Sequence, residues 1–254
     1  MPETTSKDLF DYVLRVGDNA LILSQQVSQW CGHAPALEED IAFANVSLDL
    51  IGQATNWLTY ASEVEGASRS PDDLAFLRNE RNFKNALLVE QPNGDFGQSL
   101  MRQFLFDCFH YFQLESLVSS SDGRIAEIAQ KSIKEVTYHL ERSSDLVIRL
   151  GDGSNESHRV MQKALDKLWR FTGELITADE LDQKMSESKI GADYDAISKG
   201  FEKHINDVFK LAILQIPDPV FMASGGKTGI HSEAMGPLLA EMQHLQRSYP
   251  GAKW

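Results

Sequence analysis

The sequence predicts an all-α protein built on a four-helix bundle with one long crossover and additional C-terminal helices. Three observations predict this fold class. Apolar residues recur at helical spacing along almost all of the 254 residues, and alternating strand-like runs between turn signals are absent. The connection at residues 119–123 is also so short that the helices on either side of it must be antiparallel neighbours.

The first two long helices have clear ends. Thr5 and Ser6 are typical residues for a helix start, and Gly32 and Pro35 end the first helix. Apolar residues on two sides of this helix predict a central position in the bundle. The second helix is expected from about residue 35 to 66.

Two rows of side chains distinguish the second helix. Its apolar row is in helical register: Leu37, Ile41, Ala44, Leu48, Ile51 and Leu58. Its other row is small or polar: Ala42, Asn45, Asp49, Gly52, Gln53 and Asn56. A helix in a plain hydrophobic core would carry leucine at such positions, so the second row is unusual.

The crossover occupies residues 66–95. Ser70 and Pro71 predict the start of a short helix, and a strong turn follows at residues 92–95. The third and fourth long helices are expected at about 96–119 and 123–150. At about 1.5 Å per residue, each of the four long helices spans roughly 35–45 Å.

The C-terminal part predicts further helices at about 156–175 and 194–214, a short turn near 178–185, and a final helix from Ser232 to about Ser248. We expect a single ferritin-like helical domain over 1–254, with the bundle core at about 7–150 and a helical extension at about 151–254.

The stretch 216–231 is the least regular part of the chain. Its Gly225–Gly229 run resembles a phosphate-binding loop, but Phe221 replaces the first glycine of that motif and no strand precedes it. We expect an ordinary exposed or interface loop.

Composition limits the function classes. Lys plus Arg number 24 against 37 for Asp plus Glu, which gives a net charge of −13 and excludes nucleic acid as an expected partner. Two cysteines, Cys31 and Cys108, favour a reducing compartment. Neither a signal peptide nor a membrane-spanning run is recognisable, so we expect a cytoplasmic protein with no membrane partner.

Four acids point to the chemistry that a helical bundle of this type supports. Asp18, Asp49, Asp107 and Glu135 lie one per long helix, near the middle of each. A di-iron ferritin-like bundle needs a carboxylate on each of two helices and a Glu-x-x-His pair on each of the other two. Here Gly52 and Tyr138 occupy the two histidine positions, and neither is a good iron ligand.

We therefore expect no metal in this chain, and interpret these six positions as a relic pocket. The acids would then need relief of their mutual repulsion, because unpaired buried charges cost several kcal/mol each. A polar network is expected to provide it, from residues on or near the same rows: Gln53, Asn56, His110, Tyr138, His139 and Arg142.

A second interpretation, in which the chain is itself an enzyme, remains open. It is an independent di-iron oxygenase with an atypical ligand set: Asp18, Asp49, Asp107, His110, Glu135 and His139. Glu241 and His244 repeat the acid-x-x-His spacing on the last helix, but a solvated face explains them better.

Several motifs together resemble a known family. They are Leu14–Asn19 (LRVGDN), Ser28–Pro35 (SQWCGHAP), Asp49–Gln53 (DLIGQ), Leu87–Phe96 (LLVEQPNGDF), Lys134–Leu140 (KEVTYHL), Lys167–Phe171 (KLWRF) and Gly236–Gln243 (GPLLAEMQ). Over nearly the whole chain, from about residue 9 to 254, the sequence resembles the C subunits of the bacterial 1,2-phenylacetyl-CoA epoxidases, which act in phenylacetate degradation.

The resemblance implies a structural protein with no catalytic or cofactor-binding residues of its own. In that family the C subunit pairs with and supports a catalytic A subunit, which carries the di-iron centre. A reductase subunit with NADPH, flavin and iron–sulfur groups supplies electrons. Alone, the chain could form a homodimer, and a homodimer that binds a small acyl ligand is a third reading.

Tryptophans are candidate interface anchors, because interfaces favour them. Trp30, Trp57, Trp169 and Trp254 are the four in this chain. Core packing explains the first three at least as well.

Overall fold

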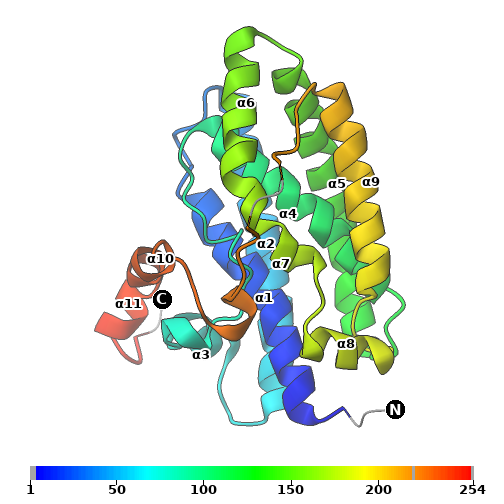
Figure 1. Cartoon of the computed structure of the whole chain (residues 1–254). Coiled ribbons are helices and arrows are strands. Elements are labelled where there is room, and N and C mark those ends of the chain that lie inside the picture. Colours follow the sequence, from blue (N-terminus) through cyan, green and yellow to red (C-terminus); the bar gives the residue numbers. More distant parts are fainter. Residues whose placement is uncertain (1–3, 219–220, 253–254) are drawn as a thin grey trace. The chain divides into compact units, whose positions relative to one another are not determined.

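The computed structural model describes residues 4–218 and 221–252 (Figure 1). These residues contain helices and connecting segments but no strand, so the predicted all-α class is confirmed. Among them, no helix combines the length and the apolar character needed to cross a membrane.

The chain separates into two compact units, each described here by itself. One comprises residues 4–92 together with the segment that begins at Ser224, and the other comprises residues 93–223. The expected boundary at about residue 150 falls inside the second unit. The single ferritin-like domain stays a prediction.

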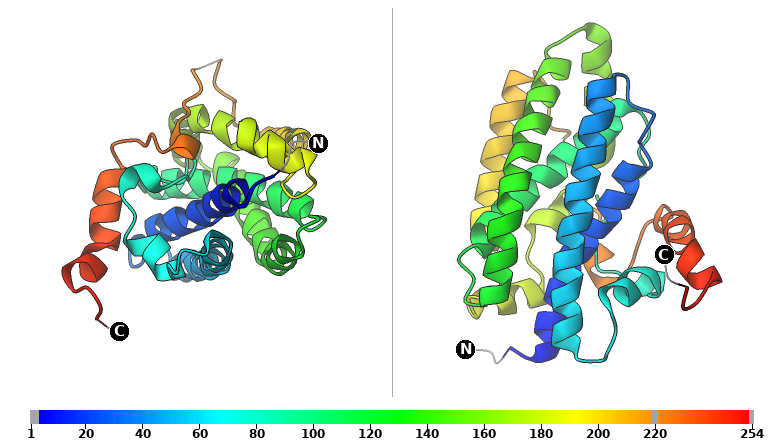
Figure 2. Two further views of the ribbon diagram at one scale, coloured as in Figure 1. Left: turned by 90° about the horizontal axis from the view of Figure 1, so that it is seen from below. Right: turned by 180° about the vertical axis from the view of Figure 1, so that it is seen from behind.

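The first unit is built on two long helices, α1 (Ser6–Ser28) and α2 (Leu37–Glu65), which lie side by side in Figures 1 and 2. The side chain of Thr5 accepts a hydrogen bond from the Asp8 amide, and the Asp8 carboxylate accepts one from Thr5 in return. This capping box fixes the start of α1, as the sequence predicted.

Shorter elements complete the first unit. They are α3 (Pro71–Phe76), the 3-10 turns η1 (Glu80–Asn82) and η3 (Gly226–Thr228), α10 (Met235–Met242) and α11 (His244–Ser248). A second capping box, between Ser70 and Asp73, confirms the predicted start of α3.

The second unit centres on α4 (Phe96–Leu117), which is buried along most of its length. Residues 118–122 lead back into α5 (Gly123–Gly151), and α6 (Asn155–Leu168) and α9 (Tyr194–Leu211) pack on the same pair. The remaining elements are η2 (Trp169–Phe171), α7 (Gly173–Ile176) and α8 (Glu180–Glu187).

Two predicted helices are interrupted. The helix expected at 156–175 ends at Leu168 and continues as η2 and α7. The final helix is divided at Gln243, whose side-chain amide is buried and donates hydrogen bonds to the carbonyl oxygens of Ala75 (3.2 Å) and Arg78 (3.0 Å). The interruption at Gln243 depends on contacts with residues far away in the sequence, which helical periodicity does not encode.

The apolar row of α2 is not buried as a whole. Leu37, Ile41 and Leu48 are 70%, 52% and 67% exposed, respectively. The buried row of α2 runs instead along a different side: Phe43, Val46, Leu50, Ala54, Trp57, Leu58 and Ala61. Trp57 therefore belongs to the core, whereas Trp30 and Trp169 are half-buried and Trp254 lies outside the described residues.

Alanine substitutions at two helical glycines of the first unit should change stability in opposite directions. A Cβ at Gly52, in the middle of α2, would meet nothing within 4 Å, so Gly52→Ala should stabilise the chain by about 0.5–1 kcal/mol. A Cβ at Gly17 would lie 3.1 Å from Trp57 and Leu58, so Gly17→Ala should destabilise it by about 1–3 kcal/mol. Urea unfolding of both variants measures the difference, and shifts of the same sign would contradict this packing of α1 on α2.

Candidate functional site

Asp18 of α1 is fully buried, and its charge is matched inside the first unit. The guanidinium group of Arg78 donates to both carboxylate oxygens, one of these bonds being 2.9 Å long. The Lys84 amide donates a third hydrogen bond of 2.8 Å to the same carboxylate. Arg78 also stacks on the Phe83 ring, 4.1 Å from its centroid. Arg78 and the Lys84 amide together occupy three of the about four lone-pair sites of this carboxylate, which leaves little capacity for a metal ion.

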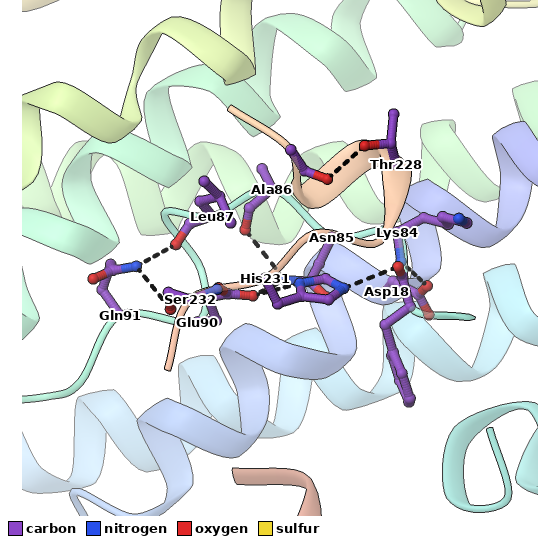
Figure 3. Close-up of polar contacts among 12 residues, drawn as sticks. Asp18, Lys84, Asn85, Ala86, Leu87, Glu90, Gln91, Thr228, His231 and Ser232 are labelled. Atoms are coloured by element: carbon purple, nitrogen blue, oxygen red, sulfur yellow. Dashed lines mark hydrogen bonds and ion pairs between the residues drawn. The ribbon is translucent and has the colours of Figure 1, made fainter. Parts of the chain in front are cut away.

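A second buried pair lies nearby in the same unit (Figure 3). His231 Nδ1 is 2.7 Å from Glu90 Oε2, and both side chains are fully buried. The Ser232 amide donates to Glu90 Oε1 at 2.6 Å, and the Asn85 side-chain amide donates to Oε2 at 3.0 Å. Burial lowers the pKa of His231, but the hydrogen bond and charge of Glu90 outweigh burial and leave the pKa raised.

The Gly225–Gly229 run packs against the segment that carries these pairs. A Cβ at Gly226 would lie 2.2 Å from the carbonyl oxygen of Asn85, and one at Gly229 would lie 2.2 Å from that of Arg81. Gly229 also has a φ of +85°, which favours glycine. These glycines allow two backbone segments to meet, which is a structural role and not a phosphate cradle.

The second unit holds its own buried ionisable groups. Asp107 and His110 of α4 and His139 of α5 are all buried, and the Gln103 side-chain amide donates to Asp107 Oδ1 at 2.6 Å. Burial raises the pKa of Asp107 to about 6, against the opposing charge of His139. Burial also lowers the pKa of His110 to about 3, so this imidazole is neutral.

The other predicted site residues lie nearer the surface. Asp49 and Glu135 are half-buried, Gly52 is exposed, and Tyr138 is 55% exposed. This corrects the expectation that Gly52 and Tyr138 line a buried relic pocket. Gly52 precedes the inward-facing Gln53 by about 100° of helix rotation, and Tyr138 precedes the inward-facing His139 in the same way.

Among the described residues, no group of three or more His, Cys, Asp or Glu side chains has the arrangement to hold a metal ion. The two units treat the buried ionisable groups described above differently. The first unit pairs them, and the second holds His110 in its neutral form.

Sequence reasoning missed Arg78, Glu90 and His231. Glu90 does lie in one of the motifs that carry the family resemblance (LLVEQPNGDF), so an acid within an otherwise apolar and turn-like stretch was an available signal. Arg78 and His231 gave none, because their partners are 60 and 141 residues away in the sequence.

The fold defines a class: an all-α protein whose long helices carry buried ionisable side chains. Comparison with known proteins then gives the family. The chain belongs to the phenylacetic acid catabolic protein family, whose model matches residues 1–254. It is similar to the C subunit of the 1,2-phenylacetyl-CoA epoxidase of Escherichia coli (strain K12), with 48% identity over 243 residues that cover 96% of this chain and 98% of that one.

Removing Arg78 should leave a buried, uncompensated carboxylate. We expect Arg78→Met to lower the free energy of unfolding by about 3–5 kcal/mol, and Asp18→Asn in the same chain to restore part of this loss. The matched control is Arg159→Met, which breaks an exposed ion pair with Glu156 and should leave the free energy of unfolding nearly unchanged. Denaturant unfolding measures all of these variants. Equal losses for Arg78→Met and Arg159→Met would contradict a structural role for the buried pair.

Asp107 and His110 should affect stability in opposite directions as pH changes. The raised pKa of Asp107 means that its contribution falls as pH rises from about 4 to 6, whereas that of His110 rises between about 3 and 6.5. Asp107→Asn leaves only the second effect. The free energy of unfolding should then rise more steeply with pH over this window, by up to about 1.4 kcal/mol per pH unit.

Urea unfolding at several pH values between about 4 and 6 tests this expectation. The exposed Asp166→Asn is the control and should leave the slope unchanged. If Asp107→Asn and the unaltered chain have the same slope, Asp107 does not titrate in this window.

Proposed function

We propose that this chain is a non-catalytic, structural subunit of a multicomponent 1,2-phenylacetyl-CoA epoxidase. It would pair with the di-iron catalytic A subunit and stabilise it in the cytoplasm. The proposal draws on the family and on the similarity to a protein named as the C subunit of this epoxidase. Turnover would need the A subunit and a reductase subunit with NADPH, flavin and iron–sulfur groups.

The main support for a non-catalytic role is the pairing of the Asp18 carboxylate with Arg78. A carboxylate that ligates iron must direct an oxygen lone pair at the metal, but both oxygens of Asp18 already accept from Arg78. The buried guanidinium also places a positive charge beside this carboxylate, which disfavours a nearby metal cation. The residues of this chain therefore do not fit a di-iron centre.

The independent di-iron oxygenase is the second candidate. It would need Asp18 to leave Arg78, and it would need half-buried Asp49 and Glu135 to complete the ligand set. His110 favours it, because a neutral imidazole is the form that binds metals. We give this single favourable feature less weight than the pairing of Asp18 with Arg78, which removes Asp18 from the ligand set.

Iron content separates the two candidates. The chain should be purified alone and after co-expression with the catalytic subunit, with iron measured per chain and the mass of each species measured by size-exclusion chromatography with light scattering. We expect no iron in the chain alone, co-elution of the two proteins, and iron that follows the catalytic subunit. About two irons in the isolated chain, as a di-iron site requires, would falsify the proposal.

A further inference from the structure

The exposed face of α2 carries no charge over most of its length. Exposed residues recur along this face at spacings of three and four: Leu37, Ile41, Asn45, Leu48, Gly52 and Thr55. We call these six residues the α2 seam. Three of them are large aliphatic side chains that are more than half exposed.

A helix that faces only water does not have this composition. The other 29-residue helix, α5, provides the comparison within the same chain. Seven of its ten exposed residues are charged: Arg124, Glu127, Lys131, Lys134, Glu141, Asp145 and Arg149. The α2 seam therefore has the character of a packing surface, whereas the exposed face of α5 has that of a solvated one.

The spacing of the seam specifies what can cover it. From Ile41 to Thr55 the intervals are four, three, four and three residues, which is the heptad spacing of a seam between two helices. A Cβ at Gly52 would meet nothing within 4 Å, so the backbone there is open to close approach. Asn45 is a polar residue within the seam, a position that fixes the register of paired helices.

Charge identifies the kind of chain that supplies the covering helix. All six charged residues of α2 are acidic, at both ends and in the middle: Glu38, Glu39, Asp40, Asp49, Glu63 and Glu65. Glu65 is paired with Arg69, but Glu38 and Glu63 are exposed at opposite ends. A second copy of this chain would bring acids against acids in either orientation, which is unfavourable.

We propose that the α2 seam is the surface on which this chain receives the catalytic subunit, through a long helix that carries an uncharged row flanked by Lys or Arg. This inference rests on the proposed function and adds the surface and the chemistry of its partner. The seam supplies the apolar centre of the interface, and the acids at the two ends of α2 set the orientation of the partner helix.

Two seam variants and one matched control test the proposal. Leu48→Glu places a charge in the seam, and Gly52→Trp blocks close approach of the partner backbone. Leu211→Glu changes a leucine of similar exposure, 60% against 67%, on α9 of the other unit. Affinity for the purified catalytic subunit is measured by titration calorimetry, and thermal unfolding shows that each variant is folded.

We expect both seam variants to weaken binding by about 100-fold or more, and Leu211→Glu to stay within about threefold of the unaltered chain. Glu63→Lys should weaken binding as well, and raised salt should reduce the difference. Seam variants that bind within about threefold of the unaltered chain would overturn the proposal and leave the structural function standing.

Two other outcomes also count against the proposal. If the isolated chain forms a dimer that Leu48→Glu dissociates, the seam binds a second copy, and the charge argument is wrong. If the unaltered chain does not bind the catalytic subunit at all, the proposed function and this inference fail together.

Discussion

A buried carboxylate must be matched by a positive charge, and the first unit is organised around that requirement. Arg78 supplies the charge for Asp18, and the position of Arg78 then brings the crossover segment against α1. His231 meets Glu90 within the same segment, which ties the C-terminal part of the chain to it. Ion pairs of this kind add little net stability over an apolar core, but the loss of one partner is costly. They therefore specify which segments meet.

The second unit buries ionisable groups in a different way. Within the part of the chain that the structure describes, Asp107 and His110 have no ion pair comparable to that of Arg78 and Asp18, and burial shifts the pKa of each toward its neutral form. His110 is therefore neutral and is buried at lower cost than a charge would be, whereas Asp107, with a pKa of about 6, still ionises near pH 7 and accepts a hydrogen bond from Gln103. Histidine at position 110 is thus compatible with a packed helix interior and does not by itself indicate a metal ligand.

Local signals explain what the sequence could predict. Thr5, Ser70 and the turn at residues 92–95 mark helix boundaries through contacts within a few residues, and α1, α2, α4 and α5 have nearly the predicted ranges. The divided last helix and the Arg78 and His231 pairs depend on residues 60 or more positions apart. Helical periodicity identifies the apolar row and the polar row of α2, but it does not indicate which side of the helix is buried. Only the structure shows that Leu48 and Gly52 are exposed.

Gly52 shows how one residue supports two different explanations. From the sequence, glycine three residues after Asp49 indicates a lost histidine ligand, because that spacing belongs to metal-binding bundles. In the structure the same position is exposed, with leucine at 48 and threonine at 55 in line with it. Glycine in an exposed helix interior lowers stability, so the residue needs a reason outside the isolated chain. Close approach of a partner helix supplies that reason, and it also accounts for the aliphatic residues and the absence of charge along the α2 seam.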